Sequence, residues 1–154
     1  MNYKSLANLS DETGVLICGH GSRSVEAVRE FENMVNALKS KLPSTPLEFG
    51  YLEFATPILT DALDRLRQKE VKRVIAIPAM LFAAGHAKND IPSVLNNYSY
   101  KTGLEIIYGR ELGVNPLMLS AAGARIQETL DRSNHFPACE TLLVVVGRGS
   151  SDPD

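Results

Sequence analysis

Residues 15–23 of the chain read VLICGHGSR. In residues 15–19 the thiol of Cys18 is the only group that is not apolar. Such a continuous apolar run is typical of a strand buried on both faces. The run passes directly into a glycine-rich turn, and a helical period follows it. That period is carried by Val25, Val28, Phe31, Val35 and Leu38. A strand, a tight turn and an amphipathic helix in this order predict one unit of a parallel α/β sheet.

The same alternation continues along the chain. Further apolar runs occur at residues 47–52, 74–78, 104–108 and 142–146, and helical periods occur at residues 59–66, 93–98 and 119–130. Because crossovers between parallel strands are right-handed, this order predicts an α/β fold. We expect an open parallel sheet with helices on both faces and the flavodoxin-like strand order 2-1-3-4, plus a final strand.

Three proline-containing segments predict where helices begin. Thr56-Pro57 and Asn115-Pro116 each place a side-chain acceptor before a proline, which is the pattern of an N-cap followed by the first helical residue. Asp90-Ile91-Pro92 has a related pattern and predicts Asp90 as an N-cap.

The composition excludes several classes of protein. The chain has 154 residues, 44% of them hydrophobic and 22% charged, with a net charge of −2. A nucleic-acid or membrane-surface binder needs a basic excess, so neither partner is expected. The first residues lack the apolar core of a signal peptide, and two cysteines do not make a disulfide framework. A cytoplasmic location is therefore predicted.

Two of the three histidines follow predicted strands that are neighbours in the sheet. His20 follows the first strand and His86 follows the third, and Glu53 lies at the end of the second. The carboxyl ends of parallel strands meet at one edge, where ligands bind. Two imidazoles and a carboxylate suit a divalent ion such as Co²⁺, Ni²⁺, Fe²⁺ or Zn²⁺ and leave open coordination positions. His135 is expected at the opposite end of the sheet.

Each of these residues also has a simpler interpretation. A single histidine after a strand is more often a hydrogen-bonded loop residue than a metal ligand, and a glutamate at a strand end is commonly just solvated. The Gly-His-Gly-Ser turn could instead cradle a phosphate or carry a phosphatase histidine. However, Ser24 stands where a dinucleotide-binding fingerprint needs glycine, and Gly19 stands where a phosphatase histidine wants arginine before it.

The loop after the third predicted strand is unusually apolar. Met80, Leu81 and Phe82 continue the apolar character into a segment that should face solvent, which favours the wall of a site for a large apolar ligand. Arg23, Lys88 and Arg110 lie on the same side of the predicted sheet. These cations could pair with carboxylates on such a ligand.

Four motifs in order resemble one family. They are GHGSR (19–23), LEFATP (52–57), PAMLFAAGHAKNDIP (78–92) and VVVGRGSSDPD (144–154). Together they resemble the CbiX sirohydrochlorin chelatases, which insert cobalt, or in related members iron or nickel, into a tetrapyrrole. The resemblance implies a cobaltochelatase of cobalamin biosynthesis in which His20 and His86 bind the metal and accept pyrrole protons. Glu53 is implied as a further ligand, and Phe54 and residues 80–82 as walls for the macrocycle, with Arg23 at the rim.

The end of the chain nearly repeats its beginning. Gly19-His20-Gly21-Ser22 returns as Gly147-Arg148-Gly149-Ser150, and the long form of the family has two tandem half-domains. We therefore expect an N-terminal tail (1–13), a half-domain (14–140) and the strand and turn that open a second repeat (141–154). Because a macrocycle is held between two half-domains, the expected partner is a second copy or the missing half. No permanent cofactor is implied, since the metal is a substrate. A metal- or tetrapyrrole-binding module without turnover remains the alternative.

Overall fold

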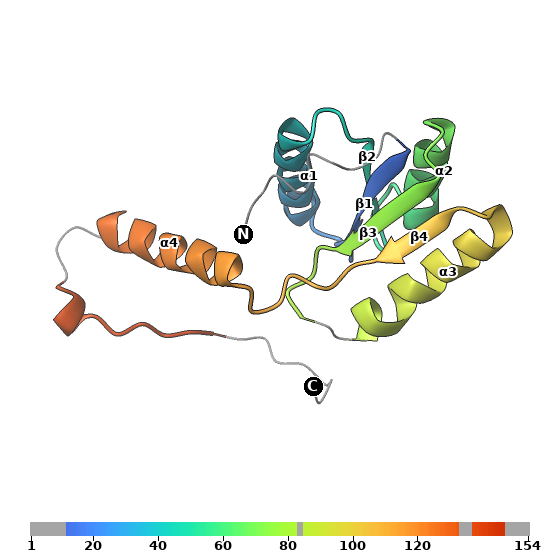
Figure 1. Cartoon of the computed structure of the whole chain (residues 1–154). Helices are drawn as coiled ribbons and strands as arrows, with labels where there is room; N and C mark the ends of the chain where they lie inside the picture. The colour runs from blue at the N-terminus through green and yellow to red at the C-terminus, as the bar shows by residue number, and fades with distance from the viewer. Residues whose placement is uncertain (1–11, 83–84, 133–136, 147–154) are drawn as a thin grey trace.

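The structure, a computed structural model, describes residues 12–82, 85–132 and 137–146 (Figure 1). Strands and helices alternate along the chain. The strands are β1 (Thr13–Gly19), β2 (Leu47–Tyr51), β3 (Arg73–Pro78) and β4 (Glu105–Tyr108), and the helices are α1 (Val25–Lys41), α2 (Leu59–Gln68), α3 (Ile91–Thr102) and α4 (Pro116–Arg132). A π-helical turn, His86–Asp90, leads directly into α3, and a short 3-10 helix, Ala138–Glu140, follows α4.

The strands form one parallel sheet in the order β2-β1-β3-β4. This confirms the predicted fold class and strand order. Ile17 of β1 pairs with Phe49 of β2 on one side and with Ile77 of β3 on the other. β1 is therefore the central strand, and all seven of its residues are buried, as its apolar sequence requires.

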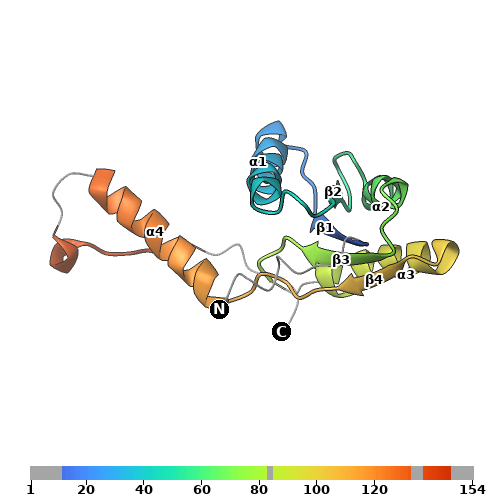
Figure 2. The same ribbon diagram turned by 45° about the horizontal axis from the view of Figure 1, so that its top comes forward.

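Helices cover both faces of the sheet (Figure 2). On one face α1 packs on β1 and β2 through a cluster of Val15, Ile17, Val35 and Leu47. On the other face α2 packs on β2 and β1, and α3 packs on β4 and α2. The core there is larger and contains Leu16, Cys18, Leu59, Ala62, Leu63, Leu66, Val71, Val74, Ala76, Ile91, Leu95, Tyr98 and Leu104. This rigid three-layer unit fixes the strand ends from which the site is built.

Of the three predicted helix starts, the structure confirms the one at Asn115-Pro116. Asn115 caps α4, since its Oδ1 accepts a hydrogen bond from the Leu117 N–H at 2.9 Å and Pro116 is the first helical residue. The prediction for Thr56-Pro57 is wrong: α2 begins at Leu59, and the carboxylate of Asp61 accepts from the Ile58 N–H at 3.3 Å. Asp90 also makes no side-chain cap, because its carboxylate binds His86 instead.

The segment after β4 departs most from expectation. α4 extends away from the sheet in both views (Figures 1 and 2), and among its described side chains none is buried. Residues 141–146 are described but form no strand, so the predicted final strand is wrong for this structure. A strand needs a neighbour to satisfy its backbone, and no strand of the described sheet pairs with this segment. The repeated turn at 147–150 and most of the tail at 1–13 lie outside the described residues.

Within the described ranges, no helix is both long and apolar enough to cross a membrane.

Candidate active site at the carboxyl end of the sheet

The turn after β1 lies tightly against the segment after β2. The β1–β2 hydrogen bonding continues past the strands, with the Leu52 N–H donating to Gly19 O at 2.9 Å and the Glu53 N–H donating to His20 O at 3.0 Å. Gly21 has a φ of 94°, and a Cβ atom added there would lie 1.7 Å from the Glu53 carbonyl oxygen. This glycine is therefore required by the close approach of the two segments. That approach brings His20 and Glu53 side by side.

The serines of the turn have a structural task. Ser24 is the N-cap of α1, and its Oγ accepts a hydrogen bond from the Ala27 N–H at 3.3 Å. Ser22 Oγ in turn accepts from the Ser24 N–H at 3.0 Å. The hydroxyls hold the helix start in place, so the chemistry of this turn is left to the histidine.

The three predicted metal ligands converge. His20, Glu53 and His86 each offer a ligand atom, and these atoms lie within 4.8 Å of one another. The imidazole rings of His20 and His86 meet edge to face, with centroids 4.6 Å apart and planes at 75°. His20 Nε2 lies 3.2 Å from Glu53 Oε1. Two ligand atoms that share an ion at about 2.1 Å can be up to about 4.2 Å apart, so small side-chain rotations bring all three onto one ion.

Hydrogen bonds at Nδ1 orient both imidazoles. His20 Nδ1 lies 3.0 Å from Gly21 O, and His86 Nδ1 lies 2.7 Å from Asp90 Oδ2. A carbonyl oxygen and a carboxylate can only accept, so in each ring Nδ1 carries the hydrogen. Nε2 of each histidine is then the atom available for a metal. Such supporting acceptors are common behind metal-binding histidines.

The sequence predicts Asp90 as a helix cap, whereas in the structure its carboxylate lies behind His86. The signal was present, because His86 and Asp90 are four residues apart and face the same side of a helical turn. The turn is itself anchored: the Tyr108 hydroxyl donates to Ala87 O at 2.9 Å. Burial, together with Cys18 and Glu111, raises the pKa of Tyr108 to about 12, so this hydroxyl stays a donor. A π-helical turn is rare and often marks a functional site.

Phe54 stands beside the histidines in an unusual conformation. Its φ is 62°, in the left-handed region that a bulky side chain rarely adopts. Its ring centroid lies 5.9 Å from that of His20, and the guanidinium of Arg23 stands over the ring at 4.9 Å. Backbone strain of this kind is characteristic of functional sites. Half of the Phe54 side chain is exposed, which leaves an aromatic surface next to the imidazoles.

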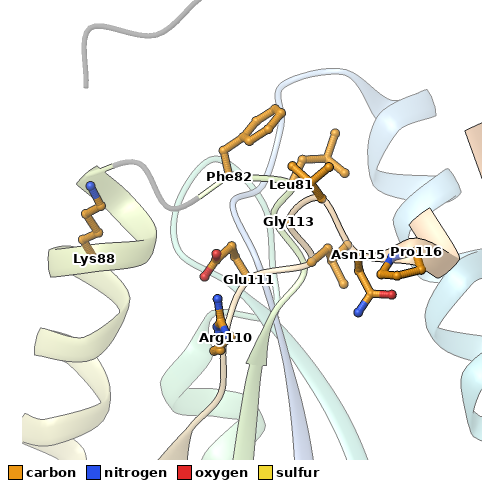
Figure 3. A pocket seen from close by; sticks show the side chains of 10 residues that line it. Leu81, Phe82, Lys88, Arg110, Glu111, Gly113, Asn115 and Pro116 are labelled. Carbon is orange, nitrogen blue, oxygen red and sulfur yellow. The ribbon is translucent and has the colours of Figure 1, made fainter. Parts of the chain in front are cut away.

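The apolar loop after β3 divides between core and surface. Met80 is half-buried and packs against the larger core cluster, whereas Leu81 and Phe82 are exposed. Leu81 and Phe82 line a pocket of about 730 Å³ together with Lys88 and Arg110 (Figure 3). The rest of the lining is Glu111, Leu112, Gly113, Val114, Asn115 and Pro116. The pocket thus joins an apolar wall to cations carried by the π-helical turn and by the segment after β4.

The chain is similar to known proteins over most of its length. The CbiX family model matches residues 14–129. The chain is 36% identical over 91% of its length to a sirohydrochlorin cobaltochelatase of Priestia megaterium, covering 45% of that protein. It is 30% identical over 99% of its length to a sirohydrochlorin ferrochelatase of the same organism, covering 56% of it. The chain therefore spans about half the length of these curated relatives.

The fold also matches a solved structure. The crystal structure of the sirohydrochlorin chelatase SirB from Bacillus subtilis subspecies spizizenii, in complex with cobalt, superposes with a TM-score of 0.71. The match covers 75% of this chain and 50% of that one at 24% sequence identity. The family model covers most of the described sheet and all three converging side chains, and on this basis the chain belongs to the CbiX family.

Proposed function

We propose that this chain is a sirohydrochlorin chelatase that inserts a divalent metal ion, Co²⁺ in our assignment, into the tetrapyrrole. The observation that carries the proposal is the contact between His20 Nε2 and Glu53 Oε1 at 3.2 Å. The ring of His20 thus faces two acceptors, Gly21 O at Nδ1 and the Glu53 carboxylate at Nε2, and a group of positive charge is needed between Nε2 and the carboxylate. A proton can fill this place in the free protein, and a divalent cation can displace it and bind both atoms. The imidazole of His86 stands next to it as a further ligand.

In this mechanism His20, His86 and Glu53 take the incoming ion from water. Three protein ligands replace part of the hydration shell and leave coordination positions open for the pyrrole nitrogens. Imidazole suits Co²⁺, Ni²⁺ and Fe²⁺ alike. The partial exposure of the three side chains fits a metal that must arrive and leave as substrate rather than remain as a cofactor.

Insertion also requires a proton acceptor. The tetrapyrrole loses two pyrrole N–H protons as the ion enters, and the metal takes the two nitrogen lone pairs that this exposes. An imidazole that releases the ion can accept one of these protons at Nε2. His86 is the better acceptor of the two, because the Asp90 carboxylate 2.7 Å from its Nδ1 stabilises the resulting imidazolium. The second proton leaves to solvent or to His20.

The macrocycle is proposed to lie against Phe54, next to His20, and against Leu81 and Phe82 in the loop between β3 and His86. Phe54, Leu81 and Phe82 are 51%, 51% and 69% exposed, and they present a surface for a flat apolar face. Arg23 and Arg110 supply positive charge for the carboxylates at its edge. Met80 supports this wall from the core side. A second copy of the chain, or a second half-domain, would supply the opposite wall.

The choice of cobalt rests on the relative with the higher identity, 36% for the cobaltochelatase against 30% for the ferrochelatase. Iron and nickel remain the alternatives within the same chemistry. The competing function is a half-domain that binds metal or tetrapyrrole without turnover, which is favoured by the coverage of only about half of the relatives' length.

The experiment follows the visible absorption of sirohydrochlorin mixed anaerobically with Co²⁺ and the protein. We expect insertion faster than with the ion alone, and we expect His20→Ala and His86→Ala to lower the protein-dependent rate about 100-fold or more. His135→Ala, which removes the third histidine, serves as the control and should leave the rate unchanged. Binding of both ligands without acceleration would identify the half-domain alternative, and unchanged rates in both histidine variants would refute the mechanism.

A further inference from the structure

The π-helical turn His86–Asp90 carries the second histidine of the site, and its main chain lacks one helical hydrogen bond. Ala87 is the buried residue of this turn. The carbonyl of a buried residue needs a hydrogen-bond donor. A helix normally provides that donor from the residue four positions further on, or five positions further on in a π-helical turn.

In this described part of the chain, neither position supplies a donor to the carbonyl oxygen of Ala87. The residue four positions further on is Ile91, and its N–H donates to His86 O. The residue five positions further on is Pro92, which has no N–H. The main chain of the turn therefore leaves Ala87 O without its usual helical partner.

The hydroxyl of Tyr108 takes the place of that partner. It donates to Ala87 O at 2.9 Å from the last residue of β4, a separate element of the fold. Tyr108 is half-buried and packs against the larger core cluster, which holds its ring in place. Burial, together with Cys18 and Glu111, raises the pKa of Tyr108 to about 12, so the hydroxyl keeps its proton at neutral pH.

The neighbours of Ala87 in the chain carry the functional groups of the turn. His86 directly precedes it, and its imidazole meets that of His20 with ring centroids 4.6 Å apart. Asp90, whose Oδ2 lies 2.7 Å from His86 Nδ1, belongs to the same turn, and Lys88 lines the pocket of Figure 3. Because these side chains follow the main chain that carries them, a bond that fixes Ala87 also fixes His86.

We infer that Tyr108 is a positioning residue of the site, which acts through Ala87 on His86. Its hydroxyl replaces the main-chain donor that Pro92 cannot supply, and it thereby keeps the imidazole of His86 next to that of His20. The consequence of this role for metal binding rests on the proposed function, whereas its consequence for the geometry of the two rings does not.

Tyr108→Phe tests this role, and Tyr98→Phe is its matched control. Phenylalanine keeps the ring in the core and removes only the donor to Ala87 O. Tyr98 belongs to the same core cluster, but its hydroxyl donates to Asp64 of α2. The control therefore loses a tyrosine hydroxyl from the same core and leaves the π-helical turn unchanged. A loss of stability without a change in position would affect both variants alike.

The first measurement is made without metal, by NMR on the full chain with labelled histidine. The rings of His20 and His86 should give a nuclear Overhauser effect in the wild type and in Tyr98→Phe, because the rings are in contact. In Tyr108→Phe we expect this effect to be lost. An effect as strong as that of the wild type would overturn the inference, as would its absence from the wild type.

The second measurement is a double-mutant cycle on Co²⁺ affinity, followed by calorimetric titration. We expect Tyr108→Phe to weaken binding about tenfold, as is usual for groups that orient a metal-binding histidine, and Tyr98→Phe to leave it unchanged. In a His86→Ala background, Tyr108→Phe should cause no further loss, because the residue through which it acts is gone. Additive losses from the two substitutions would show a general structural role and overturn the inference.

The two measurements separate this inference from the proposed function. If His86→Ala binds Co²⁺ like the wild type, His86 is not a ligand and the proposed function fails, while the contact between the rings still decides whether Tyr108 positions His86. If His86→Ala weakens binding and Tyr108→Phe does not, the proposed function stands and the inference about Tyr108 is wrong.

Discussion

His20 and His86 approach each other edge to face, with ring centroids 4.6 Å apart, although they follow different strands and are distant in the sequence. The adjacency of β1 and β3 produces this relationship, because both strands end at the same edge of the sheet. The hydrogen-bond acceptors behind the two rings then determine which ring nitrogens stay available. Gly21 O and the Asp90 carboxylate hold the Nδ1 atoms, and Nε2 of each ring is therefore the metal ligand that we propose.

The role of Asp90 can be tested by Asp90→Asn. The amide keeps the size of the side chain but removes the negative charge that orients and supports His86. We expect Co²⁺ affinity and the insertion rate to fall about 10- to 100-fold, as is usual when the support of a metal-binding histidine is lost. Calorimetric titration with Co²⁺ measures the affinity.

Asn89→Ala is the matched control, since Asn89 is an exposed neighbour on the same π-helical turn. Its affinity should equal that of the wild type. An Asp90→Asn protein that binds Co²⁺ like the wild type would show that the hydrogen bond to His86 is only structural.

Gly21→Ala should destabilise the protein. The left-handed φ and the carbonyl 1.7 Å from the new Cβ leave no room without moving the Glu53 backbone. We expect a loss of about 2–5 kcal/mol in the free energy of unfolding, measured by urea denaturation. Gly85→Ala, where the added Cβ meets nothing within 4 Å, should have no such cost and should gain up to about 1 kcal/mol. Equal stability of the two variants would contradict this view of the turn.

Phe54→Gly should separate stability from function. Glycine relieves the left-handed backbone, so the variant should be as stable as the wild type or more stable by about 1 kcal/mol. Loss of the aromatic ring should nevertheless raise the KM for the tetrapyrrole. Glu70→Gly relieves the same kind of backbone conformation in the turn after α2 and should leave KM unchanged. An unaltered KM in Phe54→Gly would exclude this ring from the substrate wall.

The buried thiol gives a test of the core. Cys18 is fully buried, and burial raises its pKa to about 12, so it carries almost no thiolate at neutral pH. In a Cys139→Ser protein the remaining thiol should not react with a maleimide or disulfide reagent until denaturant is added. Rapid reaction of the native protein would mean that β1 is less protected than its packing indicates.

The sheet could be predicted from the sequence because its interior strands carry apolar side chains toward both faces of the sheet. Continuous runs such as residues 15–19 identify parallel strands, and the strand order follows from right-handed crossovers. From that order alone His20, Glu53 and His86 were expected at one edge, and the structure brings them together. The geometry of this part follows from local sequence and topology.

Other features depend on contacts that a sequence pattern does not contain. The Asp90 pattern indicates a helix cap, and only the π-helical turn diverts its carboxylate to His86. The strained backbone of Phe54 has no sequence signal. Residues 142–146 have the composition of a strand but lack a neighbour in the described sheet, because pairing depends on a partner and not on propensity alone.

The most direct test of the site is a crystal structure of the protein soaked with Co²⁺, in which the ion is located by its anomalous scattering. We expect one ordered cobalt within about 2.0–2.2 Å of Nε2 of both His20 and His86, with a Glu53 carboxylate oxygen as the third protein ligand. Cobalt bound elsewhere, or an ion that persists at this position in the His20→Ala/His86→Ala double variant, would contradict it.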